Sequence, residues 1–86
     1  MVDVTFYGFK VSKVIVTLPR KEKDKVEEFP HLYIYSEDNN QITLLFDSYE
    51  EIINFAQELL LQAENASRCL RKLKRELKGE KRRDGD

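Results

Sequence analysis

The chain has one histidine and one cysteine, and these two side chains are the first candidates for chemistry. His31 follows Pro30, and no serine or cysteine is placed in the sequence as a nucleophile for it to activate. Cys69 has no neighbouring histidine to activate its thiol. A metal centre needs several ligands, which one histidine and one cysteine do not supply. We therefore expect a protein that is not an enzyme, with no catalytic residues, no metal site and no cofactor.

The remaining polar residues offer no second route to an active site. Glu50 and Glu51 complement the dipole of a predicted helix, and the three glycines are isolated at positions 8, 79 and 85, so no phosphate-binding loop is present. The single cysteine excludes an internal disulfide, which favours a reducing compartment. The sequence shows neither a signal peptide nor an apolar run near the ~20 residues needed to span a membrane. We expect a cytoplasmic protein with no membrane partner.

Alternation of apolar and polar residues predicts four β-strands. They cover residues 2–7, 13–18, 32–35 and 42–46, and the highly charged residues 19–30 are interpreted as an exposed connection. Residues 37–40 are Asp, Asn and Glu, of which Asp and Asn tolerate the positive φ of a tight hairpin. Short links between strands favour an antiparallel meander. The face with Leu32 and Ile34 is the more apolar one and is assigned to the core.

One long helix is predicted over residues 48–78. Ser48 and Glu51 fit a capping box, and Gly79 suits the position after the helix end. Thirty helical residues span ~45 Å, whereas a seven-residue strand spans ~23 Å. The predicted fold is therefore α+β with the order β-β-β-β-α, in which the helix packs on one sheet face and projects beyond it. Residues 1–78 form a single domain, and residues 79–86 form a disordered charged tail.

Apolar residues recur along this helix at alternating spacings of three and four, which is a heptad seam. The seam consists of Tyr49, Ile52, Ala56, Leu59, Ala63, Ala66, Leu70, Leu73 and Leu77. Further apolar residues widen only its first half, as in a helix that covers a sheet, while the narrow second half is typical of a helix that meets another helix. The second half could fold back onto an edge of the same domain. We favour homodimerisation through Ala63, Ala66, Leu70, Leu73 and Leu77.

The charge of the chain reverses within the helix at Arg68. Residues 1–67 carry six Lys/Arg against twelve Asp/Glu, whereas residues 68–86 carry nine against four, although the whole chain has a formal net charge of −1. A parallel helix pair would place two basic ends side by side, whereas an antiparallel pair places each basic end beside an acidic first half. We therefore favour an antiparallel dimer. The predicted basic arm for partner binding is Arg68, Arg71, Lys72, Arg75 and Lys78.

The same basic arm fits a nucleic-acid-binding protein, because several Lys and Arg could neutralise phosphates together. Tyr7, Phe9, Tyr33 and Tyr35 form a predicted sheet face on which bases could stack or a partner protein could bind. The sequence pI of about 5.9, however, is far below that of a typical nucleic-acid-binding domain. Binding of single-stranded nucleic acid is therefore the second choice.

The β-β-β-β-α order, with Ile42, Thr43 and Leu44 leading into a helix capped at Ser48, resembles a family of single-stranded-DNA-binding transcriptional coactivators. The resemblance implies an antiparallel sheet followed by a dimerising helix and an affinity for single-stranded DNA. It covers element order only, and it assigns no site residue.

The favoured interpretation is a small non-catalytic protein-interaction module, a homodimer that regulates or inhibits another protein by binding it. An acidic body with a basic arm steers docking onto a surface of complementary charge. A regulator or inhibitor of viral type is the version to test first. The sequence does not identify the protein partner.

Overall fold

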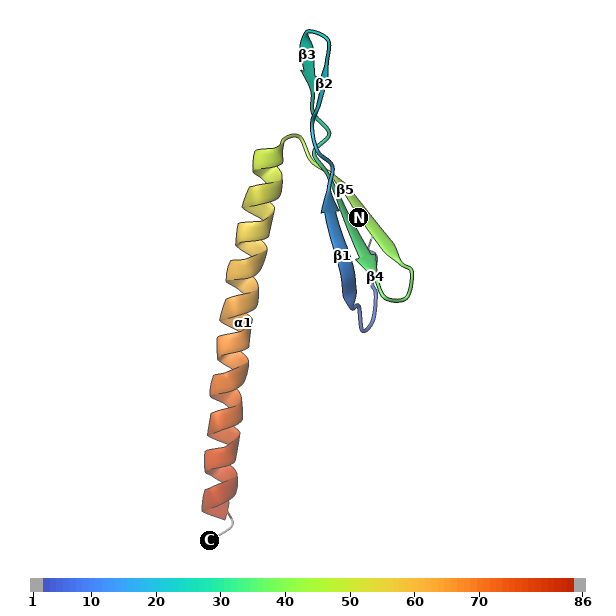
Figure 1. Ribbon diagram of the computed structural model, residues 1–86. Helices are drawn as coiled ribbons and strands as arrows, with labels where there is room; N and C mark the ends of the chain where they lie inside the picture. Colours follow the sequence, from blue (N-terminus) through green and yellow to red (C-terminus); the bar gives the residue numbers. More distant parts are fainter. Residues whose placement is uncertain (1–2, 85–86) are drawn as a thin grey trace. The chain divides into compact units, whose positions relative to one another are not determined.

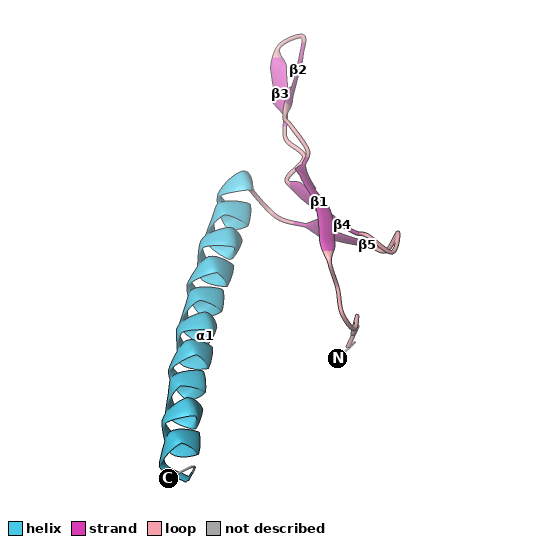
Figure 2. Ribbon diagram, turned by 60° about the horizontal axis from the view of Figure 1, so that its bottom comes forward, coloured by secondary structure: helices cyan, strands magenta, loops and turns pink. Residues whose placement is uncertain are grey.

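The computed structural model describes the backbone of residues 3–84 and the side chains of residues 3–79. The described chain contains five strands and one helix (Figure 1), coloured by type in Figure 2. These elements are β1 (Val11–Val16), β2 (Arg20–Glu22), β3 (Lys25–Glu27), β4 (His31–Ser36), β5 (Gln41–Leu45) and α1 (Tyr49–Asp84). The chain divides into two units, Met1–Ile52 with all the strands and Ile53–Asp86 with most of the helix.

A three-stranded antiparallel sheet forms the larger part of the first unit, with the strand order β1-β4-β5. In the central strand, Ile34 is paired with Val14 of β1 and with Ile42 of β5. Apolar side chains therefore meet on one face, which is the face assigned to the core from the sequence. The α+β class with an antiparallel sheet and a long C-terminal helix is confirmed, but the single four-stranded meander is wrong.

The predicted first strand, residues 2–7, is the first reason for that difference. Residues 3–7 are not in a strand, and Val2 lies outside the described residues. Val4 and Phe6 instead line a hollow with Ile42 and Leu44 of β5. Apolar side chains that alternate in sequence can thus contact a sheet through one face while their backbone forms none of the hydrogen bonds that define a strand.

The second reason is the charged segment that was interpreted as an exposed connection. Its residues are indeed mostly exposed, but they form an antiparallel ribbon of β2 and β3. Cross-strand pairing sets Arg20 opposite Glu27 and Glu22 opposite Lys25, and opposite charges at such positions are favourable. Lys23 turns the ribbon with a φ of 51°. Charges on both faces hide the period of two, so the sequence pattern missed this ribbon.

The tight hairpin between β4 and β5 is confirmed. Asn39 has a φ of 65°, and the Ser36 amide donates to the Asn40 carbonyl at 2.9 Å. The Ser36 hydroxyl accepts from the Asn40 amide at 3.0 Å, and Ser36 is buried. The turn fixes the register that places Leu32 and Ile34 on the same face as Ile42.

Helix α1 begins where the capping pattern predicts. The Glu51 amide donates to the Ser48 hydroxyl at 3.2 Å, which satisfies one of the free amides of the first turn. The helix runs past the expected end at Lys78 to Asp84, because Gly79 does not take the positive φ that ends many helices. The last two residues of the predicted tail, 85–86, lie outside the described residues.

Candidate interaction surfaces

The first turn of α1 is tied to the strands by one side chain. The Tyr49 hydroxyl donates to the Thr17 carbonyl at 2.8 Å and accepts from the Phe29 amide at 3.1 Å. Both partners lie in the segments that flank the β2–β3 ribbon, so one phenol satisfies a backbone donor and a backbone acceptor together. Ile52, one turn further on, is 8% exposed. The first two residues of the heptad seam therefore belong to the first unit.

From Ile53 onward the seam has a different character. Every described side chain from Ile53 to Gly79 is exposed. The exposed fraction is 57% for Leu59, 52% for Leu70, 55% for Leu73 and 57% for Leu77. The structure thus divides a seam that is continuous in sequence, with Tyr49 and Ile52 used inside the first unit. The predicted partner-binding residues Ala63, Ala66, Leu70, Leu73 and Leu77 all lie in the exposed part.

The predicted basic arm lies on the same exposed helix. Its members Arg68, Arg71, Lys72, Arg75 and Lys78 are all exposed, together with Lys74. One ion pair is formed among the described residues of the helix, between Arg68 and Glu64 at 3.7 Å, with both side chains more than half exposed. Such a pair contributes little to stability. Apart from this weak pair at Arg68, the arm presents exposed cations.

The spacing within the basic arm opposes its own helix. Like charges four residues apart on a helix repel, and the arm together with Lys74 contains three such pairs. They are Arg68 with Lys72, Arg71 with Arg75, and Lys74 with Lys78. A long helix in water gains most of its stability from packing of an apolar face. A helix with a repulsive arm and an exposed seam is one that a partner would stabilise.

A row of aromatic rings follows the central strand on the face opposite Leu32. The rings of Phe29 and His31 lie 6.2 Å apart and those of His31 and Tyr33 lie 6.3 Å apart, both edge to face. The Tyr33 hydroxyl is 3.4 Å from Nδ1 of His31. Tyr35 continues the row, because alternate residues of a strand share a face. His31, the first residue of β4, is half-buried within this row.

The structure unites only half of the predicted aromatic sheet face. Tyr33 and Tyr35 share the row, whereas Tyr7 and Phe9 lie outside the strands. Tyr7 is 93% exposed, and the Phe9 ring lies 5.6 Å from that of Phe6. The sequence prediction missed Phe29 and His31, although the period of two from residue 29 to residue 35 was a signal that could have found them.

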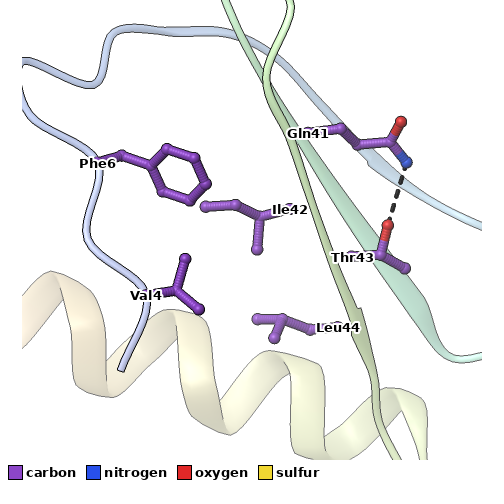
Figure 3. A pocket seen from close by; sticks show the side chains of 6 residues that line it. All are labelled: Val4, Phe6, Gln41, Ile42, Thr43 and Leu44. Atoms are coloured by element: carbon purple, nitrogen blue, oxygen red, sulfur yellow. Dashed lines mark hydrogen bonds between the residues drawn. The ribbon is translucent and has the colours of Figure 1, made fainter. Parts of the chain in front are cut away.

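The hollow beside β5 is a third surface, shown in Figure 3. It has a volume of about 410 Å³ and is lined by apolar Val4, Phe6, Ile42 and Leu44, with Gln41 and Thr43 bonded to each other at 3.1 Å. No ionisable side chain is among the described residues that line it, and its apolar wall can bind an apolar group.

No cluster of three or more His, Cys, Asp or Glu that could hold a metal occurs among residues 3–79, whose side chains are described. Cys69 is a free, exposed thiol on the helix. Within the part of the chain that the structure describes, α1 is not apolar enough to cross a lipid bilayer. Comparison with protein-family models, with curated proteins and with solved structures found no match.

Proposed function

We propose that the chain is a non-catalytic protein-interaction module, a homodimer that regulates or inhibits another protein in the cytoplasm. The observation that carries the proposal is the exposed apolar seam from Ala56 to Leu77. Four leucines in one line on a helix, each about half exposed, favour a partner that buries them. The repulsive basic arm on the same helix supports the same conclusion, since a partner also supplies the missing counter-charges.

Sedimentation velocity of the full chain tests the homodimer. We expect a dimer between about 1 and about 100 μM, the range of moderate-affinity interfaces. Leu70→Lys, which puts a charge into the seam, should give a monomer. Leu61→Lys is the matched control, because Leu61 has a similar exposure of 49% but lies away from the seam. A wild-type monomer throughout this range would remove the homodimer from the proposal.

The basic arm is proposed to recruit the protein partner, and charge variants test that role. Pull-down with the wild-type chain should recover an acidic partner that the variant Arg71→Ser/Lys72→Ser/Arg75→Ser recovers poorly. These three side chains are exposed and are not members of the seam, so their replacement leaves the seam residues unchanged. Equal recovery by both proteins would show that the arm is not the recognition element.

Binding of single-stranded nucleic acid is the second candidate, and the aromatic row of β4 is the observation that favours it. Half-buried rings at alternate positions of a strand are a surface on which bases stack. Titration with single-stranded and duplex oligonucleotides at two salt concentrations tests it, since phosphate contacts weaken steeply with salt. Absence of binding at low salt would end this candidate, and Tyr33→Ala should weaken binding if the row is the site.

A further inference from the structure

We propose that two copies of the chain pair antiparallel along α1, with the centre of the pair between Ala63 and Ala66. Residues at equal distances on either side of this centre then lie opposite each other, so Leu59 of one copy packs beside Leu70 of the second copy. This inference rests on the proposed homodimer and specifies its direction and register. The occupant of the exposed seam is thus a second copy of the same seam.

The sizes of the seam residues favour this register. The layers formed are Ala56 with the second copy's Leu73, Leu59 with Leu70, and Ala63 with Ala66. In each layer outside the centre a leucine is present on one or both sides, and the two alanines meet where the helices cross. Small residues at the crossing let the backbones approach, and leucines close the layers on both sides of it.

A parallel pair distributes the same residues unevenly. Each residue would then face its own copy, so one half has narrow layers at Ala56, Ala63 and Ala66 with a single wide layer at Leu59. The other half has only wide layers, at Leu70, Leu73 and Leu77. Two helices packed at one distance cannot satisfy both halves without leaving voids or overpacking. The antiparallel arrangement makes the width of the layers more even, because each layer outside the centre contains at least one leucine.

The first turn of the helix sets one limit of the interface. Tyr49 bonds to backbone groups of the first unit, and Ile52 is buried there, so neither is free for a second copy. The outermost complete layer is therefore Ala56 with the second copy's Leu73. Leu77 lies beyond this layer at the level of Ile52, so its replacement should weaken pairing less than replacement of Leu70.

The charges select the same direction. Residues 49–67 carry four glutamates and no Lys or Arg, whereas residues 68–78 carry six Lys/Arg and one glutamate. An antiparallel pair sets the acidic stretch along the basic one, and a parallel pair adds interhelical repulsion to the three repulsive pairs within each arm. Most of these side chains lie on the flanks and outer face of the helix. They therefore determine direction more than affinity, and salt screens them.

Disulfide trapping tests the register, on a background in which the native thiol is removed by Cys69→Ser. Leu59→Cys and Leu70→Cys are made separately and oxidised with oxidised glutathione, alone and as an equimolar mixture. In the proposed pair, residue 59 faces residue 70, so the mixture forms a covalent heterodimer and neither variant links to itself. Self-linking of each variant would show a parallel pair. A dimer by sedimentation that links in none of the three samples would exclude this register.

A second measurement leaves the seam intact. Asn54 is exposed and lies away from the seam, so Asn54→Cys in the same background can carry a spin label. In the antiparallel pair the two labels are offset by twenty-one residues, or ~31 Å along the axis, whereas in a parallel pair they lie at the same level. A label separation too short for that offset would overturn the proposal. Failure of the homodimer itself is seen separately, as a wild-type monomer in sedimentation.

Discussion

The two units of this chain use apolar side chains in opposite ways. In Met1–Ile52 the N-terminal segment and β5 line one hollow, Tyr49 bonds to the segments beside the ribbon, and Leu32 and Ile52 are buried. In Ile53–Asp86 no described side chain is buried, although leucines recur at helical spacing. The first unit therefore contains its own small core, whereas the described side chains beyond Ile52 are exposed. In the proposed homodimer, the boundary between the units would be where packing within one chain ends and packing between two chains begins.

The boundary between the two lies within one helix, and it coincides with a change in bonding. Tyr49 exchanges two hydrogen bonds with the backbone of the strand unit. Beyond Ile52, Gln62 bonds to Glu58 at 2.9 Å and Arg68 pairs with Glu64 at 3.7 Å, and both contacts are local to the helix. Substitutions on either side of the boundary should therefore affect different measurements, and this separation can be tested.

The largest effect is expected in the small core. Leu32→Ala removes a side chain that is 5% exposed and should lower the free energy of unfolding by about 2–5 kcal/mol. Urea denaturation followed by tyrosine fluorescence measures it. Leu45→Ala, at a leucine that is 70% exposed, is the control and should cost far less. Equal costs would mean that the sheet face carrying Leu32 is not the core.

The next effect is expected in the seam, and on association instead of folding. Leu70→Ala removes a half-exposed leucine twice per dimer, so it should weaken dimerisation by about 2 kcal/mol, or about 30-fold. Sedimentation equilibrium measures it. Leu61→Ala should leave the dimerisation constant nearly unchanged. If instead Leu70→Ala lowered the unfolding free energy of a monomer, the division into two kinds of core would be wrong.

The sequence predicted those parts of the fold that depend on local patterns. The cap at Ser48 and the hairpin at Asn39 both follow from side chains that bond to nearby backbone, and both are present. Three of the predicted strands also correspond to β1, β4 and β5, with ends shifted by one or two residues. Local bonding and period-two alternation are visible in a single sequence, so these elements could be predicted.

The failures come from contacts between distant residues. Val4 and Phe6 alternate with polar residues as in a strand, but whether their backbone pairs with a neighbouring strand depends on tertiary structure, which the alternation does not reveal. Tyr49 and Ile52 follow the same heptad spacing as Leu70, and spacing alone does not show that Ile52 is buried within the chain whereas Leu70 is half exposed. The aromatic row at His31 could have been predicted from its period, whereas the bridging role of the Tyr49 hydroxyl could not.

A smaller effect tests the bond that marks the boundary. Tyr49→Phe leaves the ring but removes the hydroxyl, so the Phe29 amide and the Thr17 carbonyl each lose a partner. We expect a loss of about 1–3 kcal/mol in unfolding free energy, with the dimerisation constant unchanged. Thermal unfolding and sedimentation measure the two quantities. Tyr7→Phe, at a side chain 93% exposed, should change neither, and a similar loss there would contradict a specific role for Tyr49.

The smallest effect is expected at the cap, and it decides which unit the first helical turn serves. Ser48→Ala leaves the Glu51 amide without its partner and should cost about 1 kcal/mol, while Ser48→Asp restores an acceptor beside the positive end of the helix. If the turn belongs to the strand unit, as the buried Ile52 indicates, this cost falls on unfolding and not on dimerisation. Equal losses for Ser48→Ala and Ser48→Asp would show that the hydroxyl does not act as a cap. A loss seen only in dimerisation would move the boundary back to the start of the helix.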